Sequence, residues 1–279
     1  MAWTRRQFVR GLVSAGLAGA GAASAYASLV EPRRFELTET DIHVPDLPPA
    51  FDGFRIAQVS DVHYSPIVPA ADVRRVVALA QSARADLIAL TGDYTTARAS
   101  YVEPCADMLA ALNAPAGVWA VLGNHDHYTD AELTARALTR RARVGLLANS
   151  STVITRGGDT LQLVGVDDYS WGMADFARAF AGVERRRPVV LLSHQPVVLD
   201  RPEVEGVALI LSGHTHGGQI RLPFAGAPAA RLANEFKYLR GHYRRGATQL
   251  YVSRGTGTVG LPVRFGAPPE VAVLRLRRA

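Results

Sequence analysis

Five short apolar runs in this sequence each end in side chains that bind metal ions or transfer protons. Short apolar runs bounded by turn residues are typical of buried strands, and in open α/β sheets ligands lie beyond the carboxyl ends of the strands. The polar side chains at these five ends are therefore expected to converge at one edge of the fold. They are Asp61, His63, Asp93, Asn124, His125, Asp126, His194, His214 and His216.

Seven of these side chains form a coherent set of metal ligands, namely Asp61, His63, Asp93, Asn124, His194, His214 and His216. Two carboxylates, one amide oxygen and four imidazoles suit two divalent transition ions such as manganese, iron or zinc, and form a poor site for calcium. Asp61 and His63 are two residues apart, as are the last two histidines, so an extended chain would project each pair to one side. Asp93 lies between the two groups and is the carboxylate able to bridge them.

The other two polar residues of the third run have different expected roles. Asn124 and His125 are adjacent, and adjacent side chains of an extended segment point to opposite sides, so both are not expected to bind the same ion. Asp126 is a candidate partner of a nearby imidazole, whose tautomer it would fix. The alternative for Asp126 is a carboxylate at a helix start without a catalytic part.

Helical patterns alternate with the first three strands. Apolar stripes at helical spacing predict helices over residues 71–84, 101–112 and 130–143, with Thr129 and Asp130 as candidate N-caps of the third. Strands that alternate with helices of this length indicate a parallel sheet with right-handed crossovers.

The pattern changes after Gly145. Runs at 151–155 and 160–166 flank the Gly157-Gly158 pair, which predicts a hairpin turn. A helix at 173–181 and closing strands at 251–253 and 271–276 follow. These features predict a second, partly antiparallel sheet packed on the first.

The first thirty residues are not expected to be part of the fold. Arg5 and Arg6 precede an uncharged segment from Gly11 to Val30, and Ala25-Tyr26-Ala27 offers a cleavage site. This resembles a twin-arginine export signal, which implies the twin-arginine translocase as a partner and a location in the periplasm, the cell wall or on the outer face of the cytoplasmic membrane. An uncleaved anchor is the alternative. Residues 31–53 are expected to form a connector with an edge strand at 35–44, and residues 54–279 the main domain.

Composition narrows the possible partners. The formal charge is +6, and because Lys237 is the only lysine among 31 basic residues, the other 30 are arginines. They are scattered without a long basic block, so no nucleic acid is expected as a partner. Cys105 is the only cysteine, which excludes an intramolecular disulfide, and it is expected to be buried in the helix at 101–112.

The polar blocks resemble a known family. Asp61-x-His63, Gly92-Asp93, Gly123-Asn124-His125-Asp126, His194 and Gly213-His214-Thr215-His216 are similar, in order and spacing, to the five blocks of the calcineurin-like metallophosphoesterases, over about residues 54–276. Tyr64, Tyr94, Gly217-Gly218-Gln219 and Arg254-Gly255-Thr256-Gly257 look like an exported bacterial phosphodiesterase branch, some members of which act on phospholipid-like or lipid-A-precursor diphosphates.

The resemblance implies a fold and a mechanism. The fold would be a four-layer α/β/β/α sandwich of two mixed sheets flanked by helices. One metal ion would be held by Asp61, His63 and His216, the second by Asn124, His194 and His214, with Asp93 shared. The ions would hold a bridging hydroxide for in-line attack, and His125 would be the general acid. The expected activity is hydrolysis of a phosphodiester or a diphosphate, with a lipid-linked ester as one candidate substrate.

Two alternatives and several residues outside the blocks stay open. A scaffold that uses the same fold without catalysis has no reason to keep seven ligands and an acid, and a nuclease is disfavoured by the dispersed arginines. His127 and His242 are expected at the surface or in a substrate pocket, and Trp119 and Trp171 in packing. The apolar loop 222–228 is a candidate contact with a bilayer or acyl chain, or an ordinary packed loop.

Overall fold

The main domain contains two β-sheets, and alternate side chains along their strands are buried on opposite faces. In the computed structural model, which describes residues 4–228 and 237–279, Ile56 and Leu87 face the space between the sheets. Their neighbours Ala57 and Ile88 face the helices on the other side. This two-residue period places one apolar face of each strand against the other sheet and one against helices.

The first sheet carries the expected strand and helix alternation. Its strand order is β1-β12-β2-β3-β4-β5, and β2 to β5 are parallel neighbours. β12 pairs antiparallel with β2, and β1 pairs parallel with β12 at the sheet edge, as predicted for the connector. The strands are β1 (Glu36–Val44), β2 (Arg55–Val59), β3 (Leu87–Thr91), β4 (Val118–Val121), β5 (Gly145–Leu146) and β12 (Glu270–Arg278).

The second sheet is mixed, as the sequence predicts. Its order is β10-β11-β9-β8-β7-β6, with antiparallel pairs at both edges and parallel pairs between them. Gly157 and Gly158 both have positive φ, as a tight hairpin between β6 and β7 requires. The strands are β6 (Ser150–Arg156), β7 (Asp159–Gly165), β8 (Val189–Leu192), β9 (Leu209–Ser212), β10 (Gly241–Arg245) and β11 (Thr248–Val252).

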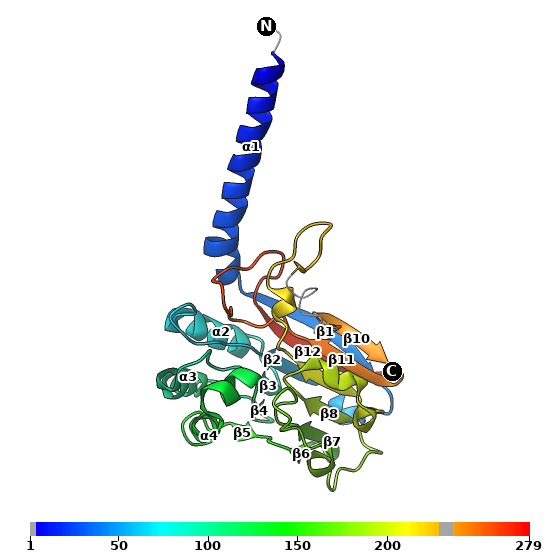
Figure 1. Ribbon diagram of the computed structural model, residues 1–279. Helices are drawn as coiled ribbons and strands as arrows, with labels where there is room; N and C mark the ends of the chain where they lie inside the picture. Colours follow the sequence, from blue (N-terminus) through cyan, green and yellow to red (C-terminus); the bar gives the residue numbers. More distant parts are fainter. Residues whose placement is uncertain (1–3, 229–236) are drawn as a thin grey trace.

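Helices cover the outer faces of both sheets, which confirms the four-layer sandwich (Figure 1). α2 (Ala70–Ser82), α3 (Val102–Leu109) and α4 (Asn124–Arg140) pack on the first sheet, and Cys105 is buried among them. α5 (Phe176–Ala179) and short 3₁₀ turns cover the second sheet.

The helix boundaries differ most from the predicted ones at α4 and α5. α4 begins at Asn124 rather than Asp130, and Asp130 breaks it with an extended backbone while its carboxylate caps the second segment by accepting the Leu133 N–H at 2.8 Å. α5 has four residues instead of the predicted nine, because the chain before Asp175 hydrogen-bonds into loops around Asn149 and Asp168. Local apolar spacing carries no information about such loop contacts.

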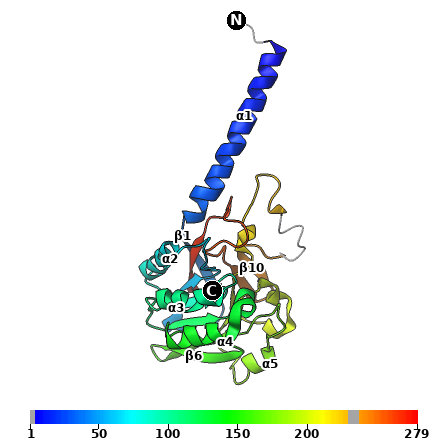
Figure 2. The same ribbon diagram turned by 60° about the vertical axis from the view of Figure 1, so that its left-hand side comes forward.

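The N-terminal helix stands apart from the body. α1 (Arg5–Ala25) projects from the sandwich, and none of its residues is buried (Figures 1 and 2). Its Thr4 N-cap and Gln7 form a capping box, so the helix start is defined by its own sequence.

Candidate metal centre

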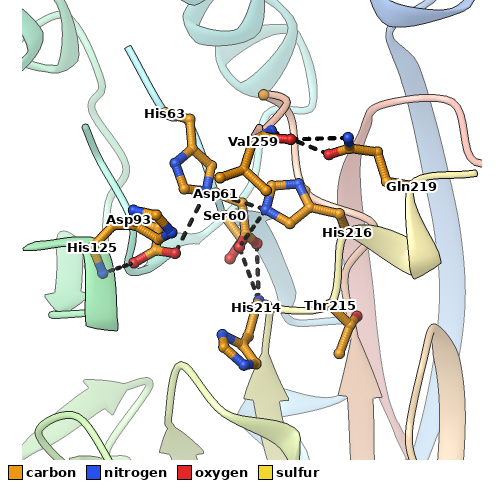
Figure 3. Close-up of polar contacts among 12 residues, drawn as sticks. Ser60, Asp61, His63, Asp93, His125, His214, Thr215, His216, Gln219 and Val259 are labelled. Atoms are coloured by element: carbon orange, nitrogen blue, oxygen red, sulfur yellow. Dashed lines mark hydrogen bonds and ion pairs between the residues drawn. The ribbon is translucent and has the colours of Figure 1, made fainter. Parts of the chain in front are cut away.

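The five predicted polar clusters meet at the carboxyl ends of strands from both sheets. β2, β3 and β4 of the first sheet and β8 and β9 of the second each stop just before one cluster. Figure 3 shows the side chains of Asp61, His63 and His216, which follow β2 and β9, pointing toward one another, with Asp93 after β3 beside them. The expected convergence at one edge is therefore what the structure has.

The backbone at the candidate ligands adopts a left-handed conformation that was not predicted from the sequence. Asp61, His63, Asp93, His214 and His216 all have φ between 51° and 71°, in the left-handed region. The prediction that Asp61 and His63, and likewise His214 and His216, lie in extended chain was wrong, because the backbone turns into the left-handed region after each strand. Backbone in this region is uncommon for residues other than glycine and is concentrated at functional sites.

Two glycines allow the close approach of these strand ends. A Cβ at Gly123 would overlap the Asp93 carboxylate, and a Cβ at Gly213 would overlap Ser60 and Asp61. Gly is therefore required before Asn124 and His214 to bring neighbouring strand ends into contact.

Asp61, His63 and His216 form the first cluster. Nε2 of His216 lies 3.1 Å from Nε2 of His63 and 3.5 Å from Oδ1 of Asp61. The Asp61 carboxylate also accepts the backbone N–H of His214 at 2.9 Å. Burial lowers the pKa of His63 to about 3 and that of His216 well below its ordinary value, so both imidazoles are neutral at pH 7.

Asp93, Asn124, His194 and His214 form the second cluster. Oδ2 of Asp93 lies 3.1 Å from Nε2 of His194, and Nδ1 of His214 lies 2.9 Å from Oδ1 of Asn124 and 3.3 Å from Nε2 of His194. Asp93 also lies 3.5 Å from Nε2 of His63. Asp93 thus lies within 3.5 Å of a histidine of each cluster.

The electrostatics of the second cluster match a cation site. Burial opposes the charged form of His194, but the adjacent Asp93 carboxylate outweighs burial and raises the pKa of His194 to about 10. Its Nδ1–H donates to the Thr91 carbonyl at 2.7 Å, so Nε2 is the nitrogen that faces Asp93. A bound cation would take the place of the Nε2 proton.

The donor set fits divalent metal ions. Ligand atoms of Asp61, His63 and His216, and those of Asp93, His194 and His214, lie within 4.8 Å of one another in each group. In the first group, two buried neutral imidazole nitrogens face each other beside a carboxylate, an arrangement that a cation satisfies. Oxygen and nitrogen donors of this kind suit manganese, iron or zinc.

His125 lies beside the first cluster and is half-buried. Its Nδ1 lies 2.7 Å from the Thr96 carbonyl, its backbone N–H donates to Asp93 Oδ1 at 2.8 Å, and its ring is perpendicular to that of His63. One of its ring nitrogens lies within 4.8 Å of ligand atoms of His63 and Asp93. The expected extended geometry of Asn124 and His125 was wrong, since both belong to the first turn of α4.

Asp126 contacts backbone amides at the start of α4, which fits the alternative of a helix-start carboxylate rather than the partner of an imidazole. Its fully buried carboxylate accepts the N–H groups of Asp93 at 2.8 Å, Gly123 at 2.9 Å and Tyr94 at 3.0 Å. Burial and the nearby Asp93 raise its pKa to about 7. Asp126 therefore joins the strand ends that carry Asp93 and Asn124.

Arg264 is a site residue that the sequence analysis missed. It is fully buried, and its guanidinium lies 3.3 Å from Nδ1 of His216 and donates to the carbonyls of Ala267 and Arg254 at 2.8 and 2.9 Å. Burial lowers its pKa to about 10. No local motif distinguishes this arginine from the 29 others, because its partner His216 is 48 residues away.

The residues outside the motif are placed as follows. Nε2 of His127 lies 2.7 Å from Asp167, and the exposed His242 contacts Gln249 at 3.0 Å. Trp119 packs against the core between the sheets, as predicted. The packing prediction for Trp171 was wrong, because this side chain is 53% exposed and its ring stacks on His127.

Comparisons with known proteins agree with this architecture. The family profile "Calcineurin-like phosphoesterase" matches residues 54–218. The chain is 35% identical over 280 residues to the "Uncharacterized metallophosphoesterase YkuE" of Bacillus subtilis, covering 98% of each protein. It is 33% identical to the "Phosphodiesterase YaeI" of Escherichia coli over 80% of this chain and 82% of the relative. It is also 27% identical to the "UDP-2,3-diacylglucosamine pyrophosphatase LpxG" of Chlamydia muridarum over 90% and 92%.

The fold is also that of a solved structure of low sequence similarity. Haemophilus influenzae NAD nucleotidase matches with a TM-score of 0.51 and 14% identity over 73% of this chain and 50% of that one. The family profile and the relatives above 30% identity identify the present chain by sequence as well. The chain belongs to the calcineurin-like metallophosphoesterases and is a phosphoric ester hydrolase.

Proposed function

We propose that this protein hydrolyses phosphodiesters or diphosphates at a centre for two divalent ions. The observation that carries the proposal is the shared Asp93 carboxylate between two groups of oxygen and nitrogen donors. Asp61, His63 and His216 would hold one ion, and Asn124, His194 and His214 the other. When bound, manganese, iron or zinc would polarise the phosphoryl oxygens and lower the pKa of a water for in-line attack.

The protein's own groups position this chemistry. Asp126 fixes the backbone that carries Asp93 and Asn124, and Arg264 contacts the ring of His216 on the side away from the cluster. These contacts restrict the ligand side chains before any ion binds, which reduces the entropy lost on metal binding.

His125 is proposed as the general acid. When its imidazole is protonated, the Nδ1–H donates to the Thr96 carbonyl and leaves the Nε2–H for the leaving oxygen of the ester. An alkoxide leaving group needs such a proton, and a positioned acid is worth a factor of about 10²–10⁴ in rate.

Three observations support the substrate class and the export route. The relatives include a protein named as a phosphodiesterase and one named as a pyrophosphatase of a diacylated sugar nucleotide. The described chain holds one apolar helix near its N-terminus, and Arg5 and Arg6 lie at its start. We propose export by the twin-arginine translocase, with a phosphate-ester substrate that is lipid-linked.

The test is a substrate panel with a matched pair of variants. Purified protein with manganese is assayed on a bis-aryl phosphate, a phospholipid, a sugar nucleotide diphosphate and single-stranded DNA. Hydrolysis of the first three with little action on DNA is expected. His214→Ala should lose all of these activities, whereas His43→Ala, an exposed change on β1, should keep them. Preferential hydrolysis of DNA would instead establish a nuclease.

A further inference from the structure

The base of α1 is built into the catalytic domain. The backbone N–H of Arg264 donates to the Ala27 carbonyl at 2.9 Å, and the N–H of Ala267 donates to the Glu31 carboxylate at 2.7 Å. Glu31 is only 3% exposed, and the ring of Tyr26 meets the edge of Phe265. These contacts fix the direction in which the helix leaves the domain.

The rest of α1 has the length and composition of a membrane-spanning segment. In the described part of the chain, the helical stretch Arg5–Arg33 is the one long and apolar enough to cross a membrane. Its uncharged segment runs from Gly11 to Val30, about the length that spans the hydrocarbon core of a bilayer, and the last five of these residues, Tyr26–Val30, belong to the helix base that contacts the domain. Leu12 and Leu17 of α1 are 59% and 71% exposed, so nothing within residues 4–228 and 237–279 covers them.

Two loops next to this helix expose further large apolar side chains. Phe224, at the tip of the turn between Leu222 and Gly226, is fully exposed, and Leu222 and Leu261 are 45% and 64% exposed. Both loops rise on the side of the sandwich from which α1 leaves, the first in gold and the second in dark red beside the helix base (Figures 1 and 2). We call Leu222, Phe224 and Leu261 the apolar rim.

The apolar rim is a continuous structure connected to the metal centre. The side-chain amide of Gln219 donates to the carbonyl of Val259 at 3.0 Å (Figure 3) and to that of Leu261 at 3.2 Å, and so joins the two loops. The Arg221 N–H donates to Phe265, the residue that contacts the helix base. Gln219 is three residues from His216, so short segments and hydrogen bonds connect the helix base, the rim and this candidate ligand.

We propose that α1 is retained as a membrane anchor and that the apolar rim inserts into the interfacial region of the same bilayer. The rigid helix base sets the distance between bilayer and domain, and it leaves Phe224 and Leu261 on the side that faces the lipid. Arg33 and Arg34, with side chains 49% and 62% exposed at the helix base, would lie among anionic headgroups. The sequence favours cleavage after Ala27, which would remove the contact between Ala27 and Arg264, and the proposed anchor reverses that expectation.

The orientation has a consequence for the catalytic site that is independent of which ester is cut. A domain held with its rim in the headgroup layer presents the His216 side of the centre to that layer. Molecules anchored in the bilayer would then reach the centre along the rim. The proposal itself concerns the surface and its lipid partner, so it stands or fails separately from the phosphodiesterase assignment.

The test places a fluorescent probe on the apolar rim of the full chain. Cys105 is buried and is replaced by alanine to leave a single labelling site in each of Phe224→Cys, Leu261→Cys and the control Val153→Cys. Val153 is 49% exposed on β6, at the end of the domain away from α1 (Figure 1). Each protein carries an NBD group and is reconstituted into vesicles of phosphatidylcholine and phosphatidylglycerol, with and without nitroxide-labelled lipid.

The expected result is a blue-shifted emission at 224 and 261 that nitroxide lipid quenches, with neither effect at 153. Emission at all three sites that matches a probe in water would overturn the proposal. A blue shift at 224 without quenching by lipid would assign the rim to a second copy of the chain. Intact mass of the membrane-extracted protein tests retention of α1, and a mass that begins at Ser28 would overturn the anchor.

Discussion

Replacement of Asp126 by alanine should cost far more stability than any other change in the first turns of α4. The substitution leaves three buried backbone N–H groups, those of Asp93, Tyr94 and Gly123, without their acceptor. Each buried donor left unpaired costs about 1–3 kcal/mol, so the total for three is about 3–6 kcal/mol at the lower half of that range. That is a large share of the about 5–15 kcal/mol by which domains are stable.

Two further variants calibrate this number. Asp130→Ala removes an exposed cap of the same helix that accepts one N–H, and it should cost about 1 kcal/mol. Asp126→Asn retains one oxygen, which can serve Asp93 and Gly123, but sets an amide N–H₂ against Tyr94. Its cost should fall between those of the two alanine variants.

Urea unfolding of the metal-free proteins measures all three free energies. Metal is removed so that loss of ion binding does not add to the cost. The reasoning is refuted if Asp126→Ala costs no more than Asp130→Ala. A normal free energy of unfolding together with weakened metal binding would return Asp126 to the role of an imidazole partner.

Three other predictions follow from the site. His125→Ala should keep both metal ions and lose turnover about 10²–10⁴-fold for alkyl leaving groups but least for nitrophenolate, and equal losses in a leaving-group series would show that His125 is not the acid. In the metal-free protein, Asp93 raises the pKa of His194 to about 10, and this contributes stability that is complete below about pH 6.5 and is lost as the pH rises through 10. The difference in unfolding free energy between wild type and His194→Gln should therefore shrink over that pH range. A constant difference would contradict this prediction. Phe224→Ser should slow hydrolysis of phospholipid in vesicles and spare a soluble aryl ester, and equal losses on both would count against lipid contact at the rim.

The positions of the candidate ligands could be predicted because they depend on strand ends. Short apolar runs identify buried strands, and the chain order of Asp61, Asp93, Asn124, His194 and His214 follows the strands that carry them. Two glycines also mark where neighbouring ends come closest. These are local properties, so one sequence suffices to find them.

The supporting contacts could not be predicted because they join distant or irregular segments. Arg264 reaches His216 across 48 residues, and nothing near Arg264 in sequence indicates that it is buried. Asp61 and His63 have left-handed backbone conformations, where the residue spacing suggested an extended chain. The Asp126 carboxylate accepts hydrogen bonds from backbone N–H groups, and the pattern of side-chain types in a sequence does not indicate such bonds.

The same limit applies to the N-terminal segment. Its composition favours an export signal, with an uncleaved anchor as the alternative. Ala27 and Glu31 make tertiary contacts with the loop around Arg264, and these contacts favour a helix that is retained in the mature protein. The sequence does not show such contacts.

The most direct test of the account is a metal titration of the metal-free protein. Manganese is added stepwise, and bound metal per chain and hydrolysis of a bis-aryl phosphate are measured on the same samples. The account predicts that activity rises only as the second ion binds, and that His214→Ala binds one ion and stays inactive. Full activity in the metal-free protein, or with a single ion per chain, would contradict the claim that Asp93 joins two ion sites.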